Sequence, residues 1–206
     1  MKFVCDIPII YEDAGILVVD KPSGLLSQPG LGPERTDSVL SRLRSALTWV
    51  ELVHRLDRDT SGLLMLSLDP AIHRMMSLAF AERRIQKHYL GVCTGTIQGE
   101  TGMIVSPLAR IGTNPPRYAA HPEGRMAVTQ WHCLSRESDH SRLRLIPITG
   151  RSHQLRAHLE GIGHPLLGDP IYGNAGNDRL MLHAESLGFT HPVTGLLQEL
   201  HVPAPF

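Results

Sequence analysis

The amino-acid sequence predicts an α+β protein in which strands outweigh helices. Short apolar runs, such as those at residues 16–20 and 62–66, lie beside polar or glycine-containing turns, as buried strands do. The 19 glycines and 15 prolines are spread along the chain, which favours many short strands over a helical bundle. Helical periodicity is confined to three segments.

The strand predictions cover most of the chain. Six segments have strand composition: residues 16–20, 62–66, 85–95, 128–133, 141–148 and 180–189. The fourth and fifth are predicted to form a hairpin. Residues 50–57 are also predicted to be extended, and strand alternation would then place Val53, Arg55 and Asp57 on one face. Residues 107–125, which include Arg110, Arg125 and Asn114-Pro115-Pro116, are predicted to form a basic loop.

Three helices are predicted, each with recognisable ends. Residues 38–47 form an amphipathic helix. A second helix starts at Asp69-Pro70, with Asp as the N-cap, and runs to about residue 84. Its predicted inward side chains are Ile72, Met75, Met76, Ala79 and Phe80. The third, residues 152–162, is predicted to be capped by Ser152 and ended by Gly163, with an apolar face of Leu155, Leu159 and Ile162.

Length and composition limit the classes of protein to consider. The 206 residues suit one domain or two small lobes, and no apolar run approaches the ~18 residues of a membrane span. The N-terminus lacks the pattern of a signal peptide. Three cysteines without a CxxC pair argue against disulfides and a cysteine zinc site, and favour a reducing cytosol. The net charge of +0 counts mildly against nucleic-acid binding, although arginines gather in a few segments.

The densest polar cluster is residues 54–62, His-Arg-Leu-Asp-Arg-Asp-Thr-Ser-Gly. Arg55 and Arg58 flank Asp57, and neighbouring cations favour the ionised form of a carboxyl group. An ionised carboxylate in a cleft can act as a nucleophile or a base. A solvated turn with local ion pairs explains the same pattern, so the cluster alone leaves both interpretations open.

Two further clusters have chemical potential. Around residues 150–158, Arg151, His153 and Arg156 lie at the predicted start of a helix, where backbone N–H groups attract anions such as phosphate. A surface helix with solvent-facing arginines is the alternative. Lys87 and Tyr89 share a predicted strand face and offer a cation beside a stacking ring, which suits a nucleotide. Ordinary half-buried packing is the alternative for Tyr89.

Other catalytic classes find little support. His153 and His158 are five residues apart, which does not match the helical spacing of an HExxH zinc site. The sequence has no P-loop, no GxGxxG motif and no GxSxG nucleophile elbow. These absences argue against a metalloprotease, a nucleotide-binding fold and a serine hydrolase.

Together these segments resemble the RluA family of pseudouridine synthases along nearly the whole chain. The matching segments occur in order: Asp20-Lys21-Pro22-Ser23-Gly24-Leu25, residues 54–63, Lys87-His88-Tyr89-Leu90, Gly150-Arg151-Ser152-His153-Gln154-Leu155-Arg156, residues 164–169 and Leu182-His183-Ala184. The resemblance implies the pseudouridine synthase fold, with a mixed, largely antiparallel sheet, flanking helices and a central RNA-binding cleft. It also implies isomerisation of uridine in RNA, with no cofactor and no metal.

The resemblance also implies roles for individual residues. Asp57 matches the family's catalytic aspartate, Tyr89 its base-contacting aromatic residue, and Arg156 the basic residue that pairs with the aspartate. Arg55 matches the arginine that fills the space left by the flipped base. Further RNA contacts are expected from Arg58, Lys87, Arg117, Arg151 and His153.

The build of the chain resembles the branch of the family without an S4 domain. Residues 1–206 are therefore expected to form a single catalytic domain, monomeric and cytoplasmic, with no membrane partner. The expected substrates are tRNA anticodon stem-loops, large-subunit rRNA, or both. A non-catalytic RNA-binding module of the same fold remains an alternative, as does a hydrolase acting on a small nucleoside.

Overall fold

The computed structural model describes residues 2–113, 115–173 and 178–206. It divides into two compact units, one of residues 1–87 and 184–205, the other of residues 88–183 with Phe206. Both units are built mainly from strands, so the predicted α+β class is confirmed. A single catalytic domain stays a prediction. Within the described ranges, no helix is long and apolar enough to cross a membrane.

The first unit contains a sheet with β1 (Lys2–Val4), β2 (Ile7–Glu12), β3 (Ile16–Lys21), β5 (Ser61–Ser67) and most of β11 (Leu182–Thr190) as successive neighbours. At the two sides, β4 (Glu51–Leu52) pairs antiparallel with β5, and β12 (Leu197–His201) pairs antiparallel with β11. The strands predicted at residues 16–20 and 62–66 are confirmed.

Apolar composition explains why β3 and β5 lie centrally. All seven residues of β5 are buried, and Leu63 and Met65 pack with Ile16, Val18 and Phe189. Gly62 is required where β5 begins, because it has φ of 107° and a Cβ atom there would lie 2.4 Å from the Ala184 carbonyl oxygen. Only glycine allows the two backbones to approach so closely.

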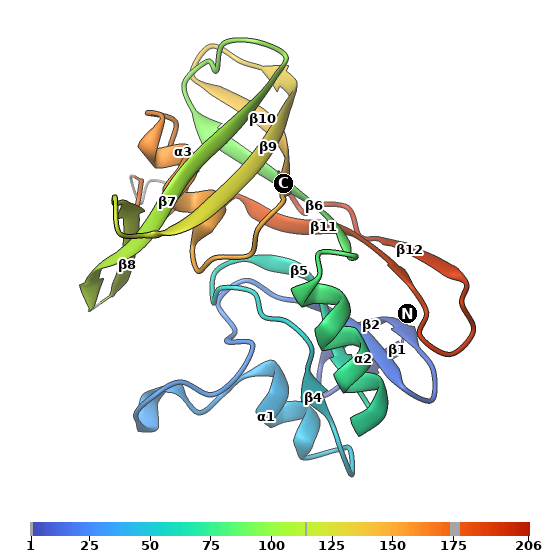
Figure 1. The fold of residues 1–206 in the computed structure, drawn as a ribbon. Coiled ribbons are helices and arrows are strands. Elements are labelled where there is room, and N and C mark those ends of the chain that lie inside the picture. Colours follow the sequence, from blue (N-terminus) through green and yellow to red (C-terminus); the bar gives the residue numbers. More distant parts are fainter. Residues whose placement is uncertain (1, 114, 174–177) are drawn as a thin grey trace. The chain divides into compact units, whose positions relative to one another are not determined.

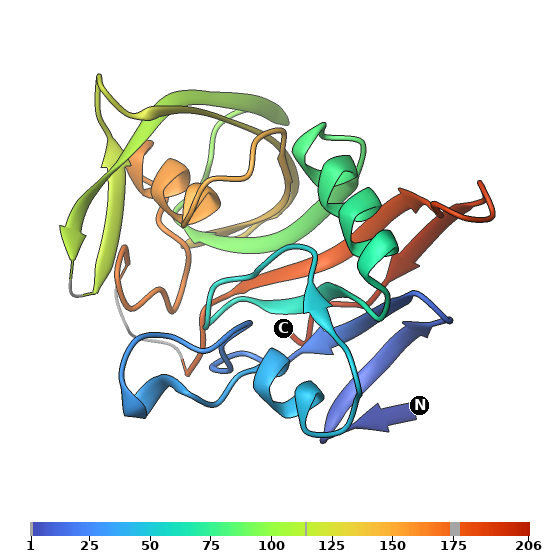
Figure 2. The ribbon, with the colours of Figure 1, turned by 60° about the horizontal axis from the view of Figure 1, so that its bottom comes forward.

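The helices of this unit follow the predicted starts but are shorter. The segment begins with a short 3₁₀ helix, η1 (Pro33–Arg35), followed by α1 (Val39–Arg44), which Ser38 caps; the prediction extended α1 to residue 47. The helix α2 (Pro70–Ala81) has Asp69 as N-cap, whose carboxylate accepts from two backbone N–H groups, as predicted. Figure 2 shows α2 (green) crossing β11 (red), and its buried residues belong to the same apolar cluster as Leu187 and Phe189 of that strand.

The inward face of α2 is narrower than its sequence predicts. Ile72, Met76 and Ala79 are buried, as predicted. Phe80 is half-buried. The prediction that Met75 lies in the core is wrong, because this residue is 50% exposed. The helix buries only one stripe, and Met75 lies beside that stripe rather than in it.

The second unit is a curved antiparallel sheet. Its neighbours in order are β6 (Gln86–Thr94), β10 (His140–Pro147), β9 (Arg125–Arg136), β7 (Thr101–Thr113) and β8 (Pro116–Ala120). Figure 1 shows β7 and β9 running side by side as long, bent strands. The predicted hairpin is confirmed by the pairing of β9 with β10. Trp131, Leu143 and Leu145 fill the core between this sheet and α3.

The predicted basic loop at residues 107–125 is wrong. Most of it forms the end of β7, the whole of β8 and the start of β9. Pro107 lies inside β7 opposite Met126, and its carbonyl accepts from the His121 N–H. Partners on both sides of β7 therefore stabilise a strand that proline disfavours locally. Asn114, part of the predicted loop, lies outside the described residues.

The helix α3 (Gln154–Gly161) starts two residues later than predicted. Its N-cap residue is His153, with φ of 54° and no side-chain cap, so the predicted cap at Ser152 is wrong. Ile162 is also wrong as a core residue because it is 41% exposed. Gly163, with φ of 83°, ends the helix as predicted, and its N–H donates to the Glu160 carbonyl.

Candidate active site

The loop around Asp57 in the first unit is held by main-chain hydrogen bonds. Four successive carbonyl oxygens, from Leu56 to Asp59, each accept at least one hydrogen bond. The Ser27 hydroxyl donates to the Leu56 carbonyl at 2.8 Å, and the Thr60 N–H donates to the Asp57 carbonyl at 3.2 Å. The Arg58 carbonyl accepts from the Lys21 ammonium at 2.8 Å and from the Gly24 N–H at 2.9 Å. The Ser23 hydroxyl donates to the Asp59 carbonyl at 2.7 Å. The backbone on either side of the half-buried Asp57 is therefore tied to residues 21–27.

Lys21 is the central residue of this arrangement. Its side chain is completely buried, and its ammonium group donates to the carbonyl oxygens of Pro22, Leu25 and Arg58 at 2.7–2.8 Å. A buried cation is costly unless its hydrogen bonds are made, and three carbonyl acceptors match its three N–H groups. Lys21 lies within the Asp20–Leu25 motif, but the sequence alone does not predict this role, because the partner Arg58 is 37 residues away.

The strand predicted at residues 50–57 ends early, at Leu52, and the side chain of His54 explains why. The strand β4 ends at Leu52, and the last ladder-like bond runs from the Val53 N–H to the Met65 carbonyl. The Met65 N–H then donates to His54 Nε2 at 3.0 Å, so an imidazole replaces the next backbone acceptor. Alternation therefore cannot place Arg55 and Asp57 on one face, because neither belongs to a strand.

The environment of His54 keeps its ring neutral. The ring stacks on Phe80 with centroids 4.6 Å apart. Burial, together with a smaller contribution from the charge of Lys87, lowers the pKa of His54 to about 3. The ammonium group of Lys87 lies over the Phe80 ring, 5.7 Å from its centroid. Burial lowers the pKa of Lys87. A neutral His54 is the form that can accept from the Met65 N–H.

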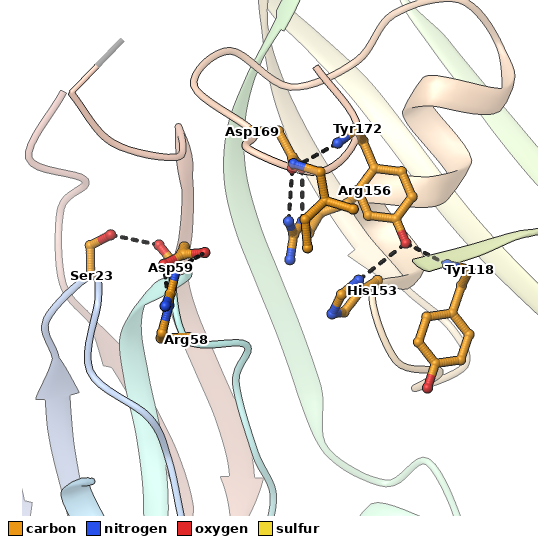
Figure 3. A network of polar contacts seen from close by, with 9 residues as sticks. Ser23, Arg58, Asp59, Tyr118, His153, Arg156, Asp169 and Tyr172 are labelled. Carbon is orange, nitrogen blue, oxygen red and sulfur yellow. Dashed lines mark hydrogen bonds and ion pairs between the residues drawn. The ribbon is translucent and has the colours of Figure 1, made fainter. Parts of the chain in front are cut away.

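The two arginines beside Asp57 have different surroundings. Arg58 donates from Nε to Oδ1 of Asp59 at 2.9 Å, as Figure 3 shows, so its local ion pair is with Asp59. Arg55 is exposed. RNA contacts by both arginines stay predictions.

Arg156 is a buried basic residue of the second unit. Its side chain is 2% exposed, and its guanidinium donates from Nε and Nη2 to the two carboxylate oxygens of Asp169. Burial alone would raise the pKa of Asp169, but the hydrogen bonds and charge of Arg156 outweigh it, and the pKa is lowered overall. The alternative interpretation, a surface helix with solvent-facing arginines, is therefore wrong for Arg156.

Tyr172 links Arg156 to other predicted site residues of this unit. The guanidinium of Arg156 lies 5.2 Å from the Tyr172 ring centroid, within cation–π range. The Tyr172 hydroxyl accepts from the Tyr118 N–H at 2.8 Å and lies 3.1 Å from His153 Nδ1. Figure 3 shows the three side chains of His153, Arg156 and Asp169 around this tyrosine.

Arg117, Arg151 and Tyr89 also have defined surroundings. Arg117 pairs with Glu160 at 2.9 Å and lies 5.4 Å from the Tyr172 centroid. Arg151 donates from Nε to the Met126 carbonyl at 3.1 Å. Tyr89 is half-buried on β6 opposite Leu145 and packs against the apolar core. The structure thus gathers Arg117, His153 and Arg156, while Asp57 belongs to the first unit and Tyr89 and Arg156 belong to the second.

Tyr172, Ser27 and the ion pair of Asp169 with Arg156 were not predicted from the sequence. Asp169 falls inside a quoted motif, but no local pattern connects it with a residue 13 positions earlier. Within the described part of the chain, no three His, Cys, Asp or Glu side chains are grouped to hold a metal ion.

Comparisons with known proteins agree with this fold and these motifs. A family model described as RNA pseudouridylate synthase matches residues 15–161. The chain is 41% identical over 204 residues to the dual-specificity RNA pseudouridine synthase RluA of Yersinia pestis, covering 96% of this chain and 99% of that protein. The protein of the same name from Escherichia coli K12 is 40% identical, with 96% and 93% covered.

A solved structure supports the same assignment. Human RNA pseudouridylate synthase domain containing 1 has a TM-score of 0.83 and 28% sequence identity, covering 100% of this chain and 86% of that one. The sequence relatives match the chain nearly from end to end, so the likeness is not confined to one motif. The chain belongs to the RluA family of RNA pseudouridylate synthases.

Proposed function

We propose that this protein is an RNA pseudouridine synthase, with Asp57 as its nucleophile. The observation that carries this proposal is the Asp57 loop itself. A carboxylate stands in the family's His-Arg-Leu-Asp motif, on a backbone whose neighbouring carbonyls are all hydrogen-bonded. A nucleophile needs such fixed placement, because small errors in its position slow attack strongly.

The proposed reaction moves uracil on its ribose. The N1–C1′ bond breaks, a C5–C1′ bond forms, C5 loses its hydrogen as a proton, and N1 gains a proton. The target base must first leave the stack, at a cost of a few kcal/mol. We propose that Arg55 helps to hold the vacated space and that Tyr89 stacks on the uracil. Asp57 attacks C1′ or C6, or assists elimination to a glycal.

Arg156 is proposed to keep the Asp57 carboxylate charged and oriented. Its bidentate bond to Asp169 and its contact with the Tyr172 ring support this role, because they fix the guanidinium in one place. Arg58, Lys87, Arg117, Arg151 and His153 are proposed to contact the RNA.

The proposed substrates are tRNA anticodon stem-loops, large-subunit rRNA, or both. The bacterial relatives carry the name dual-specificity RNA pseudouridine synthase, which supports a substrate range wider than one RNA. We propose that the protein acts as a monomer in the cytoplasm.

The experiment that tests the function uses RNA with tritium at uridine C5. Wild type is incubated with total tRNA and, separately, with rRNA fragments, beside Asp57→Asn and the control Asp37→Asn. Asp37 is an exposed carboxylate that pairs with Arg42, so its substitution removes a charge of the same kind outside the motif. We expect wild type and Asp37→Asn to release tritium, and Asp57→Asn to bind RNA without releasing it.

Other outcomes have distinct meanings. Appreciable turnover by Asp57→Asn would exclude this nucleophile. Binding without release by wild type on every RNA would favour a non-catalytic RNA-binding module. Activity on free uridine would favour a nucleoside enzyme. Tyr89→Phe keeps the ring and should keep base stacking; if it binds normally but is as inactive as Asp57→Asn, the hydroxyl has a chemical role.

A further inference from the structure

Ser27 makes two hydrogen bonds to one residue, and that residue directly precedes Asp57. Its hydroxyl donates to the Leu56 carbonyl oxygen at 2.8 Å and accepts from the Leu56 N–H at 3.0 Å. The two residues are 29 positions apart in the sequence. A single side chain therefore binds both main-chain polar groups of Leu56.

The Ser27 hydroxyl gives Leu56 the two hydrogen bonds that the backbone of a neighbouring strand would otherwise provide. Leu56 lies beyond the end of β4 and outside any strand, yet its backbone groups are bound as they would be in a ladder. A hydroxyl has one donor hydrogen and can accept as well, which matches the one acceptor and one donor of a peptide unit. Ser27 is 3% exposed and Leu56 is 6% exposed, so water has little access to replace a lost bond.

The remaining bonds in this loop act on the other side of Asp57. Lys21 and Gly24 bind the Arg58 carbonyl, and Ser23 binds the Asp59 carbonyl. On the N-terminal side, the Met65 N–H donates to the side chain of His54, two residues before Leu56. Ser27 is thus the nearest side-chain anchor on that side of Asp57.

We propose that Ser27 is a positioning residue for Asp57, acting through the backbone of Leu56. The inference rests on the proposed function, because it assumes that Asp57 reacts. Without the hydroxyl, Leu56 would shift to find other partners, and the Asp57 carboxylate would move with it. A displacement of about 1 Å can slow a reaction by roughly 100-fold. The rate of the chemical step should therefore fall far more than RNA affinity does.

The test compares Ser27→Ala with a matched deletion, Ser67→Ala. Ser67, at the C-terminal end of β5 in the first unit, is also fully buried, and its hydroxyl can donate to the Gly15 or the Asp69 carbonyl and accepts from the Asp69 N–H. Both variants lose one buried hydroxyl with backbone partners, so both should lower Tm by a few degrees. Ser27→Thr keeps the hydroxyl and serves as the conservative rescue.

Three quantities are measured at a temperature where every variant is folded: the single-turnover rate of tritium release, RNA affinity, and hydrogen exchange of the Leu56 amide. For Ser27→Ala we expect a rate roughly 10- to 100-fold below wild type, an affinity within about twofold, and faster exchange at Leu56. Ser67→Ala should keep the wild-type rate and exchange at Leu56, and Ser27→Thr should recover most of the rate.

The outcomes separate this inference from the function on which it rests. If wild type releases tritium and Ser27→Ala releases it equally fast, Ser27 does not position Asp57 although the function stands. Equal slowing of Ser27→Ala and Ser67→Ala would also overturn the inference, because general destabilisation would explain both. If wild type releases no tritium from any RNA, the proposed function fails and this inference fails with it.

Discussion

Arg156 and Asp169 form a bidentate ion pair with both N···O distances at 2.7 Å, and their side chains are 2% and 0% exposed. Two parallel hydrogen bonds fix the plane of the guanidinium as well as its position. Asp169 Oδ1 also accepts from the N–H groups of Ile171 and Tyr172, which fixes the carboxylate in turn. The pair therefore holds Arg156 in place, and Arg156 is the residue that we propose orients Asp57.

Replacing Asp169 by Asn should destabilise the protein severely. The change leaves a buried guanidinium without its counter-charge, which typically costs about 3–5 kcal/mol. Urea denaturation measures this loss. Glu100→Gln is the control, because Glu100 pairs with Arg136 at the surface and is 79% exposed, and such pairs contribute about 0–1 kcal/mol. Equal losses for the two variants would show that the Arg156 site tolerates an unpaired charge.

Folding stability should depend on pH through His54. Its pKa in the folded protein is about 3, below the ordinary value of about 6.5, so between these values the unfolded chain binds the extra proton. The free energy of unfolding then falls as pH falls through this window, by at most about 1.4 kcal/mol per pH unit. Above about pH 6.5 the ring is neutral in both states and contributes no slope.

Urea denaturation between pH 7 and pH 5 measures this slope. His54→Gln should flatten it, whereas the substitution His121→Gln, which removes an exposed imidazole, should leave it unchanged. The comparison uses slopes because His54→Gln also loses the stacking on Phe80 and is less stable at every pH. An unchanged slope in His54→Gln would mean that His54 takes up a proton in the folded protein.

Tyr172→Phe should separate the hydroxyl of Tyr172 from its ring. The variant keeps a ring beside Arg156 and Arg117 but leaves the Tyr118 N–H without its acceptor and removes the contact with His153. An unsatisfied polar group costs about 1–3 kcal/mol, which thermal or urea unfolding measures. Tyr172→Leu should lose more, because it also removes the ring. If His153 contacts RNA as proposed, KM rises in Tyr172→Phe while kcat changes little; the reverse pattern would point to Arg156 instead.

Arg117 offers a test of RNA contact against internal pairing. If it contacts a phosphate, Arg117→Gln should reduce the slope of log Kobs against log salt concentration by about 1. Glu160 competes for the same guanidinium at 2.9 Å, so Glu160→Gln should strengthen RNA binding. Filter binding at several salt concentrations measures both effects. An unchanged slope in Arg117→Gln would assign this arginine to the packing of β8 on α3.

Much of the fold could be predicted where a segment's own composition decides its structure. The apolar residues 16–19 of β3 and 63–66 of β5 favour burial by their own composition, and Asp69-Pro70 starts a helix through contacts within one turn. Predictions failed where distant partners decide. Residues 107–125 contain prolines and arginines that disfavour a strand, yet pairing on both sides of β7 makes them part of a sheet.

The sequence by itself determined the family, the α+β class and the candidate nucleophile Asp57, because motifs and apolar runs are local properties of the chain. Tertiary structure alone decided that Arg156 is buried against Asp169 and Tyr172, that His54 ends β4, and that Ser27 holds Leu56. Each of these contacts joins residues 11 to 29 positions apart. Spacing of that kind is invisible to periodicity, because hydrogen bonds depend on distances that only the folded backbone sets.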